Sequence, residues 1–284
     1  MGRMRTVGLA VAGACLMAMF ASAAASAAEY ELHAYPELGR CVAVEGGKGG
    51  YTEKNCREAS PGNTGGAYEF VPGPGAKPKF SGEGFPEEPG TFTTAAGRKI
   101  SCKVGRTEGE YTGAKTEKLT FTYNECEDSG TKASCQSLDP EGTEVKPIPG
   151  VIKTLPLKGE LGFISGGGGE RPHVGWDIKP EVGSTFAVFN CGGEAPLYLT
   201  GGTNVTVEGS LISRILPLNK MTPAFHQKFL MKKAKQFPEK LEGQEKDTLT
   251  ANFTTGIQTI TEPIIYTAKE TVGLMEKMEI KGKP

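Results

Sequence analysis

The stretch TVGLMEKMEI, residues 271–280, places four apolar side chains on one face of an extended chain: Val272, Leu274, Met278 and Ile280. The same period of two recurs in KISCKV (99–104), KLTFTY (118–123), HVGWDI (173–178) and NVTVEGSLI (204–212). Such alternation, rich in β-branched and aromatic residues, is typical of strands that bury one face. Glycine and proline, at 40 and 19 residues, supply short turns between the runs. The sequence therefore predicts an all-β fold, either an antiparallel sandwich or an open barrel.

The runs also predict which side chains face inward. These are Ile100, Cys102 and Val104; Leu119, Phe121 and Tyr123; Val174, Trp176 and Ile178; and Val205 and Val207. One stretch is ambiguous. In PAFHQKFLMKKAKQ (223–236), Phe225, Phe229 and Lys232 share a helical face, whereas Phe225, Phe229 and Met231 fit a strand.

Residues 1–28 have the pattern of a secretory signal peptide. Arg3 and Arg5 precede an apolar run from Val7 to Phe20, and small residues follow it up to Ala28. The run is shorter than the 18 or so residues that a membrane span requires. AGAC, ending at Cys15, resembles a lipoprotein processing box, but the apolar core continues beyond that cysteine. We therefore expect a secreted protein that starts at Glu29 and has no membrane span in its mature chain.

The mature chain is expected to divide into two parts. We expect a small β module over residues 29–75 and a main antiparallel β domain over residues 76–284, with the seam in the Pro/Gly-rich tract 71–90. That tract is either a linker or a coil lying over the sheet.

The charge of the mature chain excludes some partners. Without residues 1–28 it has 30 basic and 33 acidic residues, a net charge of −3. No sign dominates, so we expect binding neither to nucleic acid nor to a membrane surface through charge alone.

Six cysteines remain in the mature chain, which for an exported protein indicates three disulfides. No C-x2-C pair is present, and His33, His173 and His226 are scattered, so neither a zinc site nor another metal site is expected. Cys41 and Cys56 enclose CVAVEGGKGGYTEKNC, a hairpin-like loop, and we expect them to form a bridge.

For the other four cysteines, two arrangements are weighed. The favoured one closes the acidic loop with Cys126–Cys135 and joins distant strands through Cys102–Cys191. The competing one joins Cys102 to Cys126 and Cys135 to Cys191. Paired Cα atoms must approach within about 7 Å, and spacing alone does not select between them.

A search for catalytic motifs yields none. The chain has no G-x-S-x-G elbow, HExxH or phosphate-binding loop, since GFISGG and GGGGERP lack the required residues. Two carboxylate pairs fit a glycosidase in principle, Glu87 with Glu88 and Asp177 with Glu181, although exposed acids of this kind are usually solvated. We therefore expect no enzyme activity and no cofactor.

Three features suggest binding. Trp176 is either a sugar platform or a buried core residue, with burial favoured by its apolar neighbours. The acidic loop offers five oxygen ligands for calcium without EF-hand spacing: Glu125, Glu127, Asp128, Asp139 and Glu141. Four lysines either contact an anionic wall polymer or are solvated on a hairpin: Lys228, Lys232, Lys233 and Lys235.

A succession of blocks resembles a group of uncharacterised secreted bacterial proteins over most of residues 95–255. The blocks are KISCKV, GEYTGAKT, TFTYNECE, LKGELGFIS, VGWDIKP, FNCGG, PLNKMTPAF and PEKLEG. The resemblance implies export, a β-rich fold and disulfides, and it transfers no catalytic residue because the group has no assigned activity.

The sequence thus predicts a secreted structural or binding protein of the cell exterior. Its candidate partners are a cell-wall polymer or another exported protein. The alternative is a secreted carbohydrate-active protein, either carbohydrate-binding or glycoside-cleaving, which requires a polar cleft with two facing carboxylates.

Overall fold

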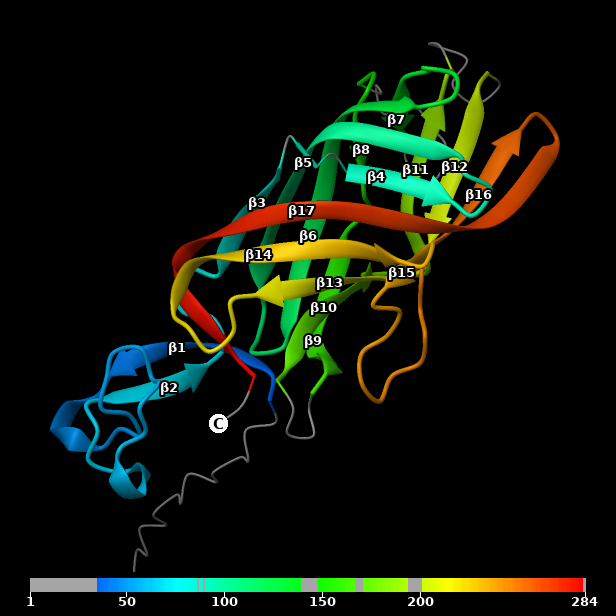
Figure 1. Cartoon of the computed structure of the whole chain (residues 1–284). Coiled ribbons are helices and arrows are strands. Elements are labelled where there is room, and N and C mark those ends of the chain that lie inside the picture. Colours follow the sequence, from blue (N-terminus) through cyan, green and yellow to red (C-terminus); the bar gives the residue numbers. More distant parts are fainter. Residues whose placement is uncertain are drawn as a thin grey trace, which may run out of the picture. The chain divides into compact units, whose positions relative to one another are not determined.

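The computed structural model describes residues 35–85, 87–88, 90–138, 148–166, 171–193 and 201–282. In these residues antiparallel strands and two short 3-10 helices make up the regular structure, which confirms the all-β prediction (Figure 1). The expected signal peptide with Cys15, and also His33, Asp139 and Glu141, lie outside the described residues.

The bounds of the elements, in chain order, are β1 Glu37–Ala43, η1 Glu45–Gly47, η2 Pro61–Asn63, β2 Tyr68–Pro72, β3 Lys79–Gly84, β4 Gly90–Thr94, β5 Lys99–Tyr111, β6 Thr116–Asp128, β7 Cys135–Ser137, β8 Ile152–Lys153, β9 Leu157–Ser165, β10 His173–Pro180, β11 Thr185–Cys191, β12 Thr203–Glu208, β13 Leu211–Leu216, β14 Thr222–Lys232, β15 Lys235–Phe237, β16 Thr250–Thr255 and β17 Gln258–Lys281.

The main sheet closes on itself. Starting from β5, each strand pairs antiparallel with the next in the order β5, β6, β9, β10, β13, β14 and β17. The sheet returns to its start because β3 and β4 each pair with both β17 and β5. The antiparallel sheet is therefore a closed barrel, whereas the sequence favoured a sandwich or an open barrel.

Aromatic side chains fill the inside of the closed sheet. Phe92 lies 4.7 Å from Tyr266 between ring centroids, and Phe229 lies 5.0 Å from the same tyrosine ring. Phe80 lies 4.6 Å from Tyr111. Because these rings occupy the interior, the inside of the sheet is a packed core.

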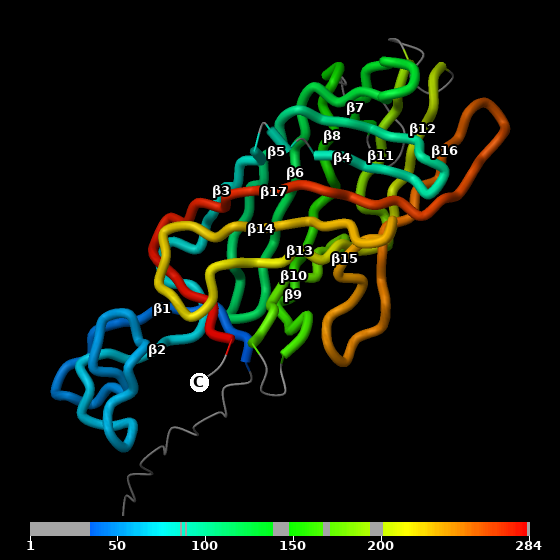
Figure 2. Tube along the Cα trace, in the orientation of Figure 1, coloured from blue at the N-terminus to red at the C-terminus, as the bar shows by residue number. Residues whose placement is uncertain are grey.

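β17 connects the closed sheet to two further groups of strands (Figure 2). Its first residues, up to Pro263, pair with β16 and so belong to a second sheet in the order β7, β11, β12, β16, β17. Its central part lies between β14 and the successive strands β4 and β3. Its last residues pair with β1, which forms a hairpin with β2.

The predicted N-terminal bridge is confirmed, since Cys41 and Cys56 form a disulfide next to the β1–β2 hairpin. Lys281 at the end of β17 reaches this region. Its Nζ donates to the Tyr51 hydroxyl at 2.7 Å and to the Cys56 carbonyl at 2.9 Å, and it lies 4.9 Å from the Phe70 ring centroid. A buried ammonium group therefore joins the stapled hairpin to the last strand.

The tract 71–90 contains a strand. Residues 79–84 form β3, which pairs with β5 and β17, so this part of the tract is neither a linker nor a coil. Sequence reading missed β3 because glycine and proline dominate its surroundings, whereas pairing with two long strands stabilises it.

The ambiguous stretch 223–236 is not helical. It forms β14 and β15, with Phe225 and Phe229 buried as strand alternation predicts and Met231 exposed. One predicted inward residue is also wrong. Val104 is exposed because the alternation of inward and outward side chains shifts by one residue at this point on both β5 and β6. On β6 the shift coincides with Glu125, whose φ is 51°.

The favoured pairing of the other four cysteines, Cys102–Cys191 and Cys126–Cys135, is wrong. The structure has the competing arrangement, Cys102–Cys126 and Cys135–Cys191. Each bridge joins residues directly opposite each other, in the β5–β6 pair and in the β7–β11 pair, with Cα atoms 4.0 and 4.1 Å apart. The prediction assumed a bridge between distant strands, but the register of neighbouring strands places the thiols together.

We predict that the Cys135–Cys191 bridge contributes most to stability. It closes the longest loop, with a sequence separation of 56 against 24 and 15. The chain-entropy model gives about 4 kcal/mol for this bridge, about 3.5 for Cys102–Cys126 and about 3 for Cys41–Cys56. Double Cys→Ala variants, compared by denaturant unfolding, test the order. A larger loss for the Cys41–Cys56 pair would contradict it.

We also predict that Lys281→Met destabilises the protein by about 3 kcal/mol, because it leaves the buried Glu279 carboxylate and the Cys56 carbonyl without their partner. Thermal unfolding measures the loss, and hydrogen exchange should locate it at β1 and β2. Lys277→Met, at an exposed position of the same strand, is the control and should change stability little. Equal effects of the two variants would refute the role of Lys281.

Candidate functional site

A groove of about 580 Å³ crosses the outer surface of β3, β5 and β6. Its floor includes the backbone of Phe80, Gly109 and Leu119, whose side-chain positions face the interior. Gly109 is required there. A Cβ at this position would lie 2.4 Å from the Lys118 carbonyl oxygen and 2.5 Å from Cζ of Phe80. The Phe80 ring therefore lies beneath a strand that has no side chain of its own at this point.

Charged side chains stand in a row across the groove. The strand register places Glu110 of β5 opposite Lys79 of β3 and opposite Lys118 of β6. Lys118 Nζ also lies 2.5 Å from an oxygen of Glu181. Its hydrogen bond to Glu181 and the charge of that carboxylate raise the pKa of Lys118. The row therefore alternates in sign, so its charges largely compensate one another.

The next row across the groove is different. Glu108 of β5 is opposite Ser81 of β3 and opposite Thr120 of β6, both of which are neutral. Glu108 has no ion pair among the described residues, and its side chain is exposed. Met275, which is 65% exposed, adds an apolar group to the same groove. The free charge offered to a ligand here is thus a carboxylate beside an apolar surface.

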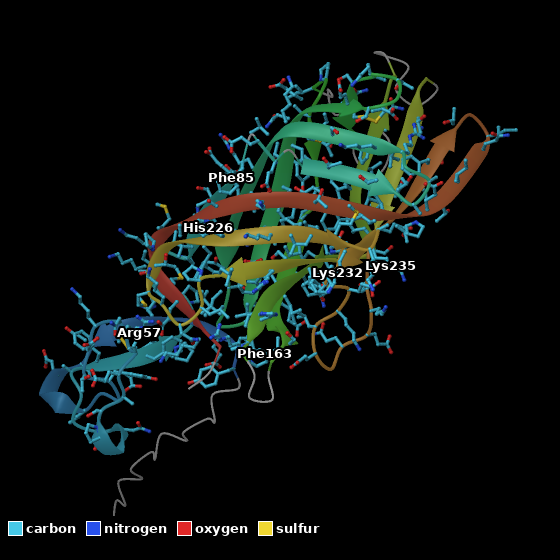
Figure 3. All side chains as sticks on the ribbon, viewed as in Figure 1. Arg57, Phe85, Phe163, His226, Lys232 and Lys235 are labelled. Atoms are coloured by element: carbon cyan, nitrogen blue, oxygen red, sulfur yellow. A yellow bond between two sulfur atoms is a disulfide. The ribbon has the colours of Figure 1, made fainter. Side chains whose placement is uncertain are left out.

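A second cavity, of about 330 Å³, lies over β14 and β17. Phe85, which follows β3, and His226 of β14 both line it from opposite sides of β17 (Figure 3). Lys228 and Lys269 also line it and are directly opposite each other in the strand register. Lys269 forms an ion pair with Glu88 in the connection between β3 and β4. Part of the positive charge in this cavity is therefore neutralised by the chain itself.

Polar side chains are buried inside the closed sheet next to this cavity. Glu270 accepts a hydrogen bond of 2.5 Å from the Thr107 hydroxyl through Oε2, and it is directly opposite Gln227. Oε1 of Glu270 and the amide of Gln227 have no hydrogen-bond partner among the described residues. Burial raises the pKa of Glu270 to about 7, against the smaller opposing effect of the Thr107 hydrogen bond.

The pKa values of other buried acids are raised for the same reason. Burial raises the pKa of Glu279 to about 7, and it raises those of Glu117 and Asp177.

Of the carboxylate pairs weighed for catalysis, Glu87 and Glu88 both line the second cavity, whereas Asp177 and Glu181 have different lysine partners. Asp177 is buried with Lys179 at 3.5 Å, whereas Glu181 is held by Lys118. Glu88 contacts Lys269. Trp176 is fully buried, as its apolar neighbours predict, so it is not a sugar platform.

The structure also places the acidic loop and the four lysines. Three acids of the loop form ion pairs: Glu125 with Lys103, Glu127 with Lys132 and Asp128 with Arg98. In the described residues no group of three His, Cys, Asp or Glu side chains is placed to hold a metal ion. Lys232, Lys233 and Lys235 are exposed around the β14–β15 turn (Figure 3), whereas Lys228 lines the second cavity.

Sequence reading missed the groove and the buried acids for different reasons. Glu270, Gln227 and Glu117 are in phase with the apolar residues Val272, Phe229 and Leu119, so extending the alternation by one step would have placed them inside. The groove residues belong to no motif. They meet only because β3, β5 and β6 pair in one register, which no local pattern shows.

Comparison with protein-family models, with curated proteins and with solved structures finds no match to this chain. None of the helices in the described residues is long and apolar enough to cross a membrane.

We predict that the protein is more stable at pH 5 than at pH 8. The pKa of Glu270 is about 7 in the folded state and close to 4.5 when unfolded, so between these values the folded state binds more protons. The free energy of unfolding therefore falls as pH rises through this window.

Glu270→Gln should remove the contribution of this carboxyl group to the pH dependence of the free energy of unfolding. That contribution is on the order of 3 kcal/mol between the unfolded and the folded pKa of Glu270. Thermal or urea unfolding at pH 5 and pH 8 measures it. Glu245→Gln, at an exposed position, is the control and should keep the wild-type pH dependence. The explanation fails if Glu270→Gln keeps that dependence too.

Proposed function

We propose that the chain is an exported binding protein whose outer groove holds an extended, cationic segment of another exported protein. The observation that carries this proposal is Glu108, an exposed carboxylate without an ion pair among the described residues, in a groove of about 580 Å³. An ammonium or guanidinium group of a ligand supplies the missing charge. The backbone floor and Met275 offer contacts to the apolar part of the same segment.

The charge of the groove favours a polypeptide over an anionic wall polymer. Its lining has three carboxylates and two ammonium groups: Glu108, Glu110, Glu181, Lys79 and Lys118. An anionic polymer would be repelled by the net negative charge, whereas a segment with lysine or arginine residues matches it.

Export is supported by the signal-peptide pattern of residues 1–28, by the resemblance to secreted bacterial proteins and by the three disulfides. Disulfides persist in oxidising compartments outside the cytosol. All strands of the groove lie within residues 76–284, and the stapled hairpin of the 29–75 module pairs with β17 of the same domain.

Selection of a random-peptide display library on the purified protein tests the proposal. We predict that the selected peptides are rich in lysine or arginine and that Glu108→Lys weakens their binding by at least about tenfold, since it replaces attraction by repulsion. Glu245→Lys makes the same charge change at an exposed site outside the groove and should leave the affinity unchanged.

Selected peptides that bind Glu108→Lys as well as wild type would contradict the proposal. Binding of neutral cell-wall oligosaccharides that is lost in Glu108→Lys, with no peptide selected, would instead support the carbohydrate-binding alternative.

A further inference from the structure

The second sheet has a free edge at the start of β17. Residues 258–262 pair with β16 on one side and have no strand on the other side among the described residues. The free edge ends at Pro263, whose carbonyl accepts the Ala95 amide, and from Ile264 onward β4 occupies that side. In Figure 1 the β16–β17 hairpin lies at the margin of the molecule. Its two-residue turn begins with Gly256, at a φ of 60°.

The hydrogen-bond phase of the β16–β17 pair identifies the groups at this edge. The Ile264 amide donates to the Leu249 carbonyl, which sets one hydrogen-bonded position of the ladder. In an antiparallel pair such positions alternate. Residues 262, 260 and 258 therefore bond to β16, and the N–H and C=O groups of Thr259 and Thr261 point outward. These are the groups with which an added strand pairs.

The edge lacks the usual protection against pairing. Natural edge strands are blocked by lysine, proline, bulges or a covering loop. Residues 258–262, with the sequence QTITE, contain no lysine, arginine or proline, and their register with β16 is unbroken. Ile260 is 59% exposed although it is opposite the buried Phe253. An apolar side chain on the core-facing side of a sheet is thus left open at its edge.

We propose that this edge pairs with the same edge of a second copy of the chain. A two-fold axis through Ile260 places Thr259 opposite Thr261 of the second copy in a hydrogen-bonded position. Both outward groups of each threonine are then used, which makes four hydrogen bonds between the copies. The same axis places the two Ile260 side chains opposite each other in a non-hydrogen-bonded position, where side chains approach most closely.

The charges fit this self-pairing. Glu262 is the one charged residue of the segment, and the two-fold register places it opposite Gln258 of the second copy. The side-chain amide of Gln258 can donate a hydrogen bond to the Glu262 carboxylate, and the two Glu262 side chains do not meet. The partner therefore matches in backbone groups, in the apolar pair and in charge, and the two sheets join into one continuous sheet. An isologous contact of this kind uses up both edges, so the assembly closes as a dimer.

Molar mass measured by light scattering or sedimentation over a range of concentrations tests the proposal. Because the contact is short, we expect a reversible dimer with a Kd on the order of 1–100 µM. Thr261→Pro should abolish the dimer, because the Thr261 amide points outward and no backbone hydrogen bond within the chain is lost. The variant loses only the side-chain hydrogen bond from the Thr261 hydroxyl to Asn252. Ile260→Lys should abolish it as well, by placing two ammonium groups opposite each other.

Ile257→Lys is the matched control. Ile257 is fully exposed in the turn and lies outside the paired segment, so this variant should remain a dimer. Unchanged melting temperatures in all three variants exclude loss of folding as the cause. The proposal is overturned if the wild type stays monomeric up to about 1 mM, if Thr261→Pro and Ile260→Lys still dimerise, or if Ile257→Lys also becomes monomeric.

Discussion

The structure depends on one unbroken strand, β17, which runs for 24 residues and changes its partners along its length. It pairs in turn with β16, with β4 and β14, with β3 and finally with β1. Its middle part closes the main sheet, and its two ends attach the second sheet and the stapled hairpin. Because side chains alternate along a strand, a slip of one residue would turn every inward side chain of β17 outward. A single register thus constrains three groups of strands.

The same constraint explains the buried acids. Glu270 shares the inward phase of Val272 and Tyr266, and its strand is paired on both sides, so its side chain is held inside the sheet. Burial of a charged carboxylate is costly, and the group is compensated by the Thr107 hydroxyl and by an increased affinity for protons. The polar groups of the core therefore follow from strand phase and need not indicate a catalytic centre.

The packed interior leaves the outer surface for recognition. Aromatic rings fill the closed sheet, whereas the groove lies on its outer face and the free edge belongs to the second sheet. The two surfaces differ in chemistry. The groove offers Glu108, a carboxylate without an ion pair among the described residues, and the edge offers backbone donors and acceptors with an apolar side chain. Ligand binding and self-association are accordingly proposed at separate places, with separate substitutions that affect each.

Period-two patterning in the sequence alone determined the strand character of the chain and most of its inward residues, including Trp176, Phe121 and Val272. It also indicated the Cys41–Cys56 bridge, because both cysteines flank one short loop. Pairing between strands distant in sequence leaves no local signal, so the closure of the sheet and the strand β3 emerged only in the tertiary structure. The choice between the two cysteine arrangements was also decided there, because it depends on strand register. The same holds for the groove and the free edge. Alternation along a strand depends on its own residues, whereas register depends on which strand lies beside it, and that neighbour is chosen by packing of the whole chain.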